Sequence, residues 1–237
     1  MWKMKNSRVY AVILASGKGE RMNCGIPKQF LKIKDKSLVE YAIEAFEKNR
    51  NIDSIIIVTE SASREKLNEI IGKAHYTKVS AIVDGGRTRF ESSVNGVNAV
   101  PEKEAKILIH DAARPFVSQR IIDETVSALD KYPAVEVAVK ATDTIIERND
   151  GFLLSATTER DRMMQVQTPQ GFSLEVIKKA HEAAMKESDL KATDDCGLIF
   201  RYGICDVFVV EGDRQNIKIT YPEDLLFANY VVDALNF

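Results

Sequence analysis

The sequence lacks the features of an exported or membrane-spanning protein. It contains three cysteines, Cys24, Cys196 and Cys205, and none of them stands in CxxC or CxxH spacing. An odd, unpatterned set of thiols argues against a disulfide framework and a structural zinc site, and it predicts reduced thiols in a cytoplasmic protein. We find no signal peptide and no apolar run of membrane-spanning length, so we expect a soluble chain that does not act at a membrane.

An excess of charge of one sign is also missing. The chain has 33 basic and 35 acidic residues and a formal net charge of −2. A nucleic-acid-binding protein is usually basic, so we expect no nucleic-acid partner. An anionic substrate would therefore have to be bound by local groups of cations rather than by the field of the whole protein. With 237 residues and 45% hydrophobic content, the chain can bury a sizeable core, and we treat residues 1–237 as one domain.

What is present is an alternation of short apolar runs with helical patterns. The expected strands are 8–14, 54–58, 79–83, 106–110, 134–140 and 206–210. The expected helices are 37–48, 62–73, 88–99, 118–130, 173–186, 193–201 and 222–235. This alternation predicts an α/β fold with a Rossmann-like, mainly parallel sheet and helices on both faces. Ligands of such sheets bind beyond the carboxyl ends of the strands, where we expect the binding residues.

The segment from about 141 to 165 interrupts the alternation. Its sequence, with a turn signal at Asn149, Asp150 and Gly151 between two apolar stretches, predicts a β-hairpin inserted into the domain. The residues alone leave two alternatives open. The hairpin is either an arm that contacts a partner subunit or a hairpin folded onto its own domain.

A glycine-containing loop follows the first expected strand. The residues at 15–19, ASGKG, are small enough to let the backbone approach a ligand closely, and Lys18, Arg21 and Lys28 add positive charge. Spare amide donors beside fixed cations suit a polyphosphate. The loop is neither GxxxxGKS/T nor a dinucleotide fingerprint, because Met22 stands where the third glycine would be. A plain tight turn with solvated charges is the alternative.

Two further strand ends carry groups suited to a nucleotide and a metal. Gly85 and Gly86 follow the strand at 79–83 and lead into a helix that offers serine hydroxyls, although a plain helix cap at Thr88 would also fit. Asp111 follows the strand at 106–110 and suits Mg²⁺, which needs few protein carboxylates when phosphate oxygens and water complete its shell. The alternative for Asp111 is a simple pair with Arg114. We expect the neighbouring His110 to be a packed, hydrogen-bonded residue.

Five ordered motifs resemble one family of nucleotidyltransferases. They are LASGKGERM with PKQF, GGRTRFESSVNG, HDAARP, QTPQ and NIKIT with PEDL, and they extend from Val9 to about Tyr230. They are similar to those of the cytidylyltransferases that act on 2-C-methyl-D-erythritol 4-phosphate and on ribitol 5-phosphate. The resemblance implies the fold of the nucleotide-diphospho-sugar transferases, CTP as a substrate, Mg²⁺ as a cofactor, and a homodimer clasped by the hairpin.

The resemblance also implies roles for individual residues. The catalytic residues would be Arg21, Lys28 and Lys218. The nucleotide-binding residues would be Ala15, Ser16, Gly17, Gly19, Gly85, Gly86, Arg89, Ser93, Ala112 and Arg114. The acceptor would contact Asp111, Thr144, Arg160 and Thr193, with Arg162 as the alternative to Arg160. Asp111 would hold the metal. From the residues alone, Lys218 could equally be a strand lysine that extends to solvent.

The sequence features disagree about which polyol phosphate is the acceptor. The Ala112–Ala113 pair, TDD at 193–195 and NIKIT with PEDL favour methylerythritol phosphate and hence isoprenoid precursor synthesis. Lys140–Ala141, where methylerythritol enzymes usually have a proline, favours ribitol phosphate, whose CDP derivative serves cell-wall or capsule polymers. We predict methylerythritol phosphate, with ribitol phosphate as the alternative. A nicotinamide-dependent oxidoreductase and a non-catalytic nucleotide-binding protein are the competing classes, and the missing third glycine argues against the first.

Overall fold

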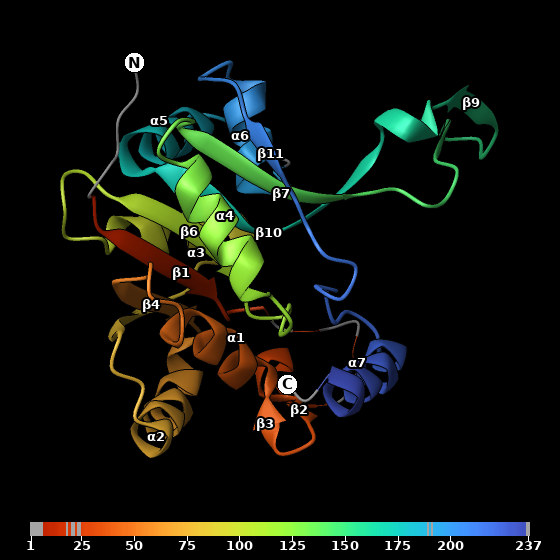
Figure 1. Ribbon diagram of the computed structural model, residues 1–237. Coiled ribbons are helices and arrows are strands. Elements are labelled where there is room, and N and C mark those ends of the chain that lie inside the picture. The colour runs from red at the N-terminus through yellow and green to blue at the C-terminus, as the bar shows by residue number, and fades with distance from the viewer. Residues whose placement is uncertain are drawn as a thin grey trace.

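The computed structural model describes residues 7–17, 19, 22, 25–188, 190 and 192–235. Its centre is a seven-stranded sheet in the order β11–β7–β10–β6–β1–β4–β5 (Figure 1). The strands are β1 (Val9–Leu14), β4 (Ser54–Thr59), β5 (Val79–Asp84), β6 (Lys106–Asp111), β7 (Ala134–Lys140), β10 (Met164–Ser173) and β11 (Phe208–Glu211). All of these strands run in one direction except β10, which is antiparallel to both of its neighbours. The predicted mainly parallel sheet is confirmed.

Strand β10 is the element of the sheet that the sequence did not reveal. It reads MQVQTPQGFS, with alternating polar residues and a proline, and proline is rare in central strands because it cannot donate to the ladder. The structure accommodates Pro169 where the pairing with β7 shifts register, between Gln167 and Gly171. A short hairpin of β2 (Lys32–Ile33) and β3 (Lys36–Ser37) was also not expected.

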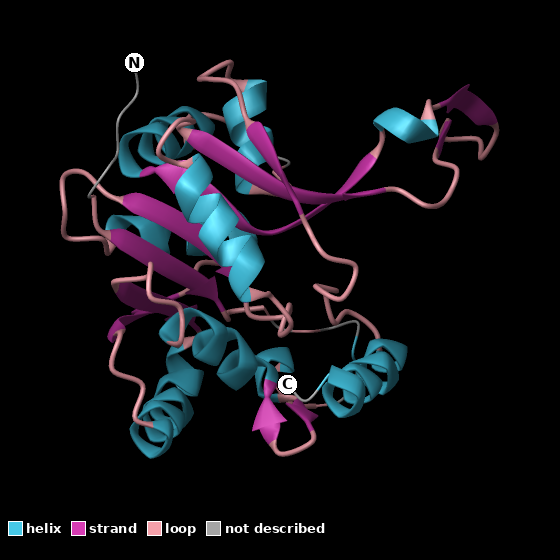
Figure 2. Ribbon diagram, in the orientation of Figure 1, coloured by secondary structure: helices cyan, strands magenta, loops and turns pink. Residues whose placement is uncertain are grey.

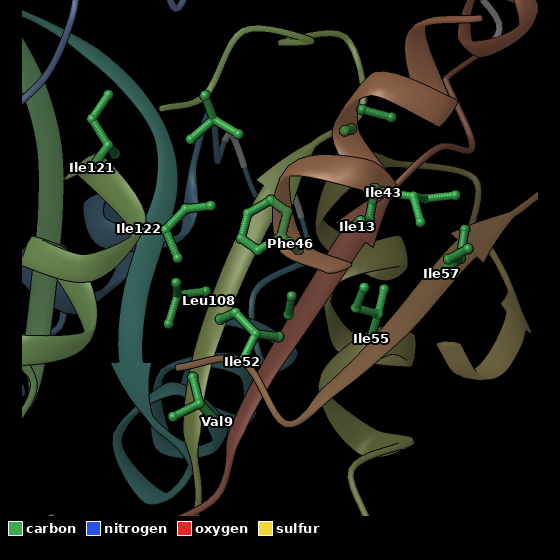
Figure 3. Packing of buried hydrophobic residues seen from close by; sticks show 14 of the residues in the cluster. Val9, Ile13, Ile43, Phe46, Ile52, Ile55, Ile57, Leu108, Ile121 and Ile122 are labelled. Carbon is green, nitrogen blue, oxygen red and sulfur yellow. The ribbon is translucent and has the colours of Figure 1, made fainter. Parts of the chain in front are cut away.

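Helices cover both faces of the sheet, as expected from β1, β4 and β6, in which every residue is buried. On one face, α1 (Leu38–Glu47), α2 (Arg64–Ala74) and α4 (Gln119–Ala128) pack against alternate residues of the strands. Figure 3 shows this layer, with Phe46 of α1 lying over the sheet between Ile13 and Leu108. On the other face lie α3 (Arg89–Asn98), α5 (Leu174–Ala184) and α6 (Asp195–Arg201). Single 3-10 turns occur at Lys28–Phe30, Ser61–Ser63 and Arg160–Arg162.

The C-terminal helix α7 (Pro222–Leu235) packs beside the small hairpin rather than on the main sheet. Its Ala228 belongs to an apolar cluster with Ile33, Phe116 and Ile219. The backbone N–H of Ile219 donates to the carbonyl oxygen of Ala113 over 2.8 Å. This contact brings the NIKIT segment to the carboxyl end of β6.

Residues 141–163 leave the sheet between β7 and β10 and carry a second small hairpin, formed by β8 (Ile146–Arg148) and β9 (Leu154–Thr157). Figures 1 and 2 show this hairpin standing away from the body of the protein. Its apolar side chains are exposed, with 78% of Phe152 and 67% of Leu153 accessible to solvent. The hairpin is therefore not folded onto its own domain, and its contact with a partner subunit stays a prediction. In the described part of the chain, no helix combines the length and the apolar character needed to cross a membrane.

Candidate active site

A cleft of about 630 Å³ opens at the carboxyl ends of β1, β5 and β6, where the parallel topology predicts a ligand site. Ten of the residues singled out in the sequence line it. They are Ala15, Ser16, Gly17, Gly19, Lys28, Gly86, Arg89, Asp111, Ala112 and Lys218. The fold thus brings residues from four separate motifs to one cavity. Arg21 and Lys18 lie outside the described residues.

Two glycines allow the loops around the cleft to approach each other. Gly19 has a φ of +69°, and a Cβ there would lie 2.6 Å from the Cβ of Lys28. A Cβ on Gly85 would lie 2.4 Å from the Cβ of Ser16, so the loops after β1 and β5 touch at this point. A hydrogen bond of 2.9 Å between the hydroxyls of Ser16 and Ser92 joins the same two loops. The backbone of both loops therefore borders the cleft directly.

Asp111, the last residue of β6, is the electrostatic centre of the site. Its Oδ1 lies 3.3 Å from Nε of Arg89, and its Oδ2 accepts a hydrogen bond of 2.5 Å from Nζ of Lys218. Burial alone would raise the pKa of Asp111, but the charges of Arg89 and Lys218 outweigh it and hold the pKa well below its usual value. The carboxylate is therefore ionised at neutral pH.

Arg114 does not form the simple ion pair with Asp111 that was the alternative reading of HDAARP. Its guanidinium donates to the carbonyl oxygens of Asn216 at 2.8 Å and of Val166 at 3.1 Å. The arginine thereby ties the NIKIT segment to β10 below the cleft.

A buried network behind the cleft fixes Arg89. Its Nη1 lies 2.7 Å from Oδ2 of Asp195, the first residue of α6. The other oxygen of Asp195 accepts hydrogen bonds from Oγ of Ser93 at 2.6 Å and from Nε2 of His181 at 3.0 Å. Burial raises the pKa of Asp195, but Arg89 and His181 bring it down to about 2. Arg89 is thus held between two carboxylates.

This network separates two adjacent serines that the sequence could not tell apart. The prediction names Ser93, whose side chain is fully buried and turned toward Asp195. Ser92 lines the cleft instead, and its hydroxyl also accepts a hydrogen bond from the backbone N–H of Gly86 over 3.1 Å. The positions of the two serines on α3 decide which one faces the cleft, and this orientation is visible only in three dimensions.

His110 is a packed, hydrogen-bonded residue, as expected. Its ring is fully buried, with Nδ1 3.0 Å from the hydroxyl of Thr168 and Nε2 3.0 Å from the carbonyl oxygen of Arg114. Burial lowers the pKa of His110 to about 4, so the ring is neutral near pH 7. It has no access to the cleft and serves to join β6 to β10.

Three predicted acceptor-binding residues lie apart from the cleft. Thr144 and Arg160 are on the arm, where Arg160 is exposed and its nearest carboxylate, Asp161, is 3.9 Å away. Arg162, the alternative to Arg160, lies 3.6 Å from Glu159 on the same arm. Thr193 precedes Asp194, which caps α6, and does not line the cleft either. Within one chain, these residues are not brought together with Lys218.

A second cavity of about 310 Å³ adjoins the cleft, and Lys218 lines both. Residues of β7 and β10 form its other walls together with Arg114, Thr142, Arg214 and Ile217. Two cavities that share a lysine in their walls can hold two anionic ligands with their charged groups close together.

We compared the sequence of this chain with those of known proteins. The family of 2-C-methyl-D-erythritol 4-phosphate cytidylyltransferases, IspD, matches residues 9–234. The enzyme of that name from Geobacillus kaustophilus is 40% identical over 222 residues, which cover 94% of this chain and 96% of the relative. The bifunctional ribulose 5-phosphate reductase/CDP-ribitol pyrophosphorylase Bcs1 of Haemophilus influenzae is 37% identical, over 95% of this chain and 48% of its own length.

Solved structures show the same likeness. The crystal structure of 4-diphosphocytidyl-2C-methyl-D-erythritol synthase from Anaerococcus prevotii superposes with a TM-score of 0.85 and 30% identity, covering 96% of each chain. The match covers the sheet, the helices and the segments that carry all five motifs, because it extends over nearly the whole chain. On these grounds the chain belongs to the 2-C-methyl-D-erythritol 4-phosphate cytidylyltransferase family.

Proposed function

We propose that this protein transfers CMP from CTP to the phosphate of 2-C-methyl-D-erythritol 4-phosphate, releasing pyrophosphate and forming a CDP-polyol for isoprenoid precursor synthesis. The observation that carries the proposal is the group of Arg89, Asp111 and Lys218 at the base of a glycine-lined cleft, in a chain of this family. The cleft takes the nucleotide, and the cavity beyond Lys218 takes the acceptor.

The loops after β1 and β5 bind the nucleotide in this proposal. Ser16, Gly17 and Gly19 border the cleft, where backbone N–H groups suit the triphosphate, and Arg21 and Lys28 are its proposed counter-charges. Gly86 and Ser92 border the opposite wall, where they can contact the base and ribose, and Gly85 packs against Ser16 beside them. Ala112 and Arg114 follow Asp111 at the junction of the two cavities.

The reaction needs no nucleophilic side chain. An oxygen of the acceptor phosphate attacks the α-phosphorus of CTP, a new P–O bond forms, and the bond to the β-phosphate oxygen breaks with its electrons leaving on pyrophosphate. The protein has to align the two substrates and stabilise the negative charge that accumulates on the transferring group. Lys218 lies between the two cavities and is placed to meet that charge, and Lys28 and Arg21 are proposed to stabilise the leaving pyrophosphate.

The donor set at Asp111 fits Mg²⁺. The described residues contain no cluster of three or more His, Cys, Asp or Glu side chains that would form a protein-only metal cage. An ionised carboxylate beside a polyphosphate cleft is the type of site at which Mg²⁺ binds through one carboxylate, phosphate oxygens and water. When bound, the ion would neutralise phosphate charge. We expect EDTA to abolish turnover and Mg²⁺ to restore it, and full activity in metal-free buffer would contradict this assignment.

We also propose a homodimer in which the arm of one subunit completes the site of the other. The exposed apolar residues of the arm need a partner surface, since exposed strands with apolar side chains promote association. Thr144 and Arg160 on the arm would then meet the acceptor bound to the partner subunit. The described cysteines, Cys196 and Cys205, are not bridged, which supports a reducing compartment such as the cytoplasm.

The test is pyrophosphate release with CTP and each of two acceptors, methylerythritol phosphate and ribitol phosphate. The likeness to the CDP-ribitol pyrophosphorylase favours ribitol phosphate as the second candidate. Both acceptors carry a terminal phosphate, so discrimination must come from the groups that face the polyol hydroxyls and the branch methyl. We expect a higher kcat/KM for methylerythritol phosphate. A ratio of about tenfold or more in favour of ribitol phosphate would change the acceptor but not the reaction.

A further inference from the structure

We propose that Lys140 and Arg214 are acceptor-binding residues that hold the phosphate of the acceptor in the second cavity, beside Lys218. The inference rests on the proposed cytidylyl transfer and adds two cations of the same chain to the acceptor site. Both residues line the 310 Å³ cavity together with Arg114 and Lys218. Neither Lys140 nor Arg214 belongs to the five motifs that identify the family.

The charges that line the cavity are all of one sign. Four cationic side chains border it, and no aspartate or glutamate is among the lining residues. The chain as a whole has a net charge of −2, so this concentration of positive charge is local. A phosphate monoester carries close to two negative charges at neutral pH and accepts hydrogen bonds at three oxygens. A cavity with several cations matches that ligand.

Lys140 and Arg214 are available for a ligand. Both are exposed, and neither has an ion-pair or hydrogen-bond partner for its side chain among the described residues. Lys218, by contrast, is paired with Asp111. Because Lys140 and Arg214 are unpaired, they can contact an anionic ligand in this cavity without first breaking an ion pair.

The backbone around Arg214 is fixed in position. Asp213 next to it is anchored on β10, because its N–H donates to Oε1 of Gln167 at 3.2 Å and its carbonyl oxygen accepts from Nε2 of Gln167 at 2.7 Å. Lys140 is the last residue of β7 and pairs with Met164 of β10. The two cations therefore project from elements held against the same strand.

Arg114 adds a further unfulfilled donor at the same cavity. Its Nη atoms are bound to backbone carbonyls, whereas its buried Nε has no hydrogen-bond partner among the described residues. A buried donor without a partner costs free energy unless a ligand satisfies it. Arg114 thus adds to this cavity a positive charge that is held in place through its Nη atoms, independently of Lys140 and Arg214.

The experiment compares Lys140→Ala, Arg214→Ala and the double variant with the wild type in steady-state kinetics. We expect KM for the acceptor to rise about tenfold in each single variant, because each loses one charge-assisted hydrogen bond, while KM for CTP and kcat change less than about twofold. Lys140→Arg should retain most of the affinity. Lys131→Ala and Arg50→Ala are matched controls, since both residues are exposed and unpaired in the described structure and neither lines the cleft or the second cavity. An acceptor KM within twofold of wild type in the double variant would overturn the proposal.

Binding of inorganic phosphate separates this inference from the proposed function. Calorimetric titration with the nucleotide cleft saturated by CTP should show a phosphate site that is weakened about tenfold or more in the double variant and unchanged in the two controls. That result supports the cavity assignment even if neither polyol phosphate yields pyrophosphate, which would contradict the proposed reaction alone. Equal phosphate binding by the wild type and the double variant, or no saturable binding by the wild type, would refute the inference.

Discussion

Nζ of Lys218 lies 2.5 Å from Oδ2 of Asp111, a residue 107 positions earlier in the chain. The contact follows from backbone pairing, because the N–H of Ile219 donates to the carbonyl oxygen of Ala113 two residues beyond Asp111. The carboxylate keeps the lysine at the junction of two cavities, and the lysine helps to keep the carboxylate ionised. The central charge pair of the site is thus built from the end of β6 and the segment before α7.

Replacing Lys218 or Lys28 by alanine should reduce turnover without unfolding the protein. We expect kcat to fall about a hundredfold in each variant, as when one donor to a developing charge is removed. The Lys218 side chain is 39% exposed, and Asp111 keeps Arg89 as a partner, so the melting temperature should change little. Pyrophosphate release and thermal unfolding measure the two effects. Lys32→Ala is the control, because Lys32 is exposed and lies outside both cavities. If the Lys218 or the Lys28 variant kept more than about a tenth of wild-type turnover, the proposed role of that lysine would be wrong.

Much of this arrangement could be predicted because local rules agree with the fold. The buried parallel strands are continuous apolar runs, and the topology sends their carboxyl ends to one edge, so the glycine loops and Asp111 were expected there. Strand β10 was missed because Pro169 and its polar neighbours read as a loop, and its pairing depends on β6 and β7 from elsewhere in the chain. Lys218 was expected in the site only through the family resemblance, since no spacing rule predicts a contact across 107 residues.

Gly85→Ala should weaken nucleotide binding. A Cβ at this position would lie 2.4 Å from the Cβ of Ser16, so the loops after β1 and β5 would have to separate. We expect KM for CTP to rise about tenfold or more, with a smaller change in KM for the acceptor. Gly72→Ala in α2 is a matched control because a Cβ there meets nothing within 4 Å, and it should be neutral or slightly stabilising. If the two variants bound CTP equally well, the close approach of the loops would not matter for binding.

Because Glu136 is buried, its titration should lower the free energy of unfolding as the pH rises toward 8. Burial raises the pKa of this carboxyl to about 8, and the nearby Asp194 adds to the effect, although a hydrogen bond from Gln170 opposes it. Between the ordinary value of 4.5 and about 8, the folded state holds a proton that the unfolded state has lost, so the free energy of unfolding falls as pH increases. Unfolding by denaturant at several pH values measures this dependence.

Glu136→Gln isolates that contribution. The amide cannot ionise, so the variant should be more stable than the wild type above pH 8, and the difference should shrink toward low pH. His110, whose pKa is lowered to about 4, changes stability in the opposite direction at acid pH, but it does so in both proteins and cancels in the comparison. A constant difference between the two proteins from pH 5 to 9 would show that Glu136 is not protonated in the fold.

The arm should determine the oligomeric state. Leu153 and Leu154 are 67% and 60% exposed within one chain, and replacing both by serine removes apolar area that would otherwise be buried against a partner. We expect the wild type to sediment as a dimer at micromolar concentration and the double variant as a monomer of 26.6 kDa. Leu226→Ser on α7 is the control, since Leu226 is 76% exposed but far from the arm in sequence. A monomeric wild type would refute the dimer.

Mixing two inactive variants tests whether the arm acts on the partner subunit. In the proposed dimer, each site combines Lys218 of one subunit with Arg160 of the other. A dimer made only of Arg160→Ala subunits, or only of Lys218→Ala subunits, therefore has two damaged sites. A mixed dimer has one site with both residues intact and one with neither. Because random exchange makes half of the dimers mixed, activity should recover to about a quarter of the wild-type value. Two variants of the same position, Lys218→Ala and Lys218→Met, should give no recovery when mixed. If Arg160 acted within its own chain, the first mixture would also remain inactive, because no subunit would then carry both residues.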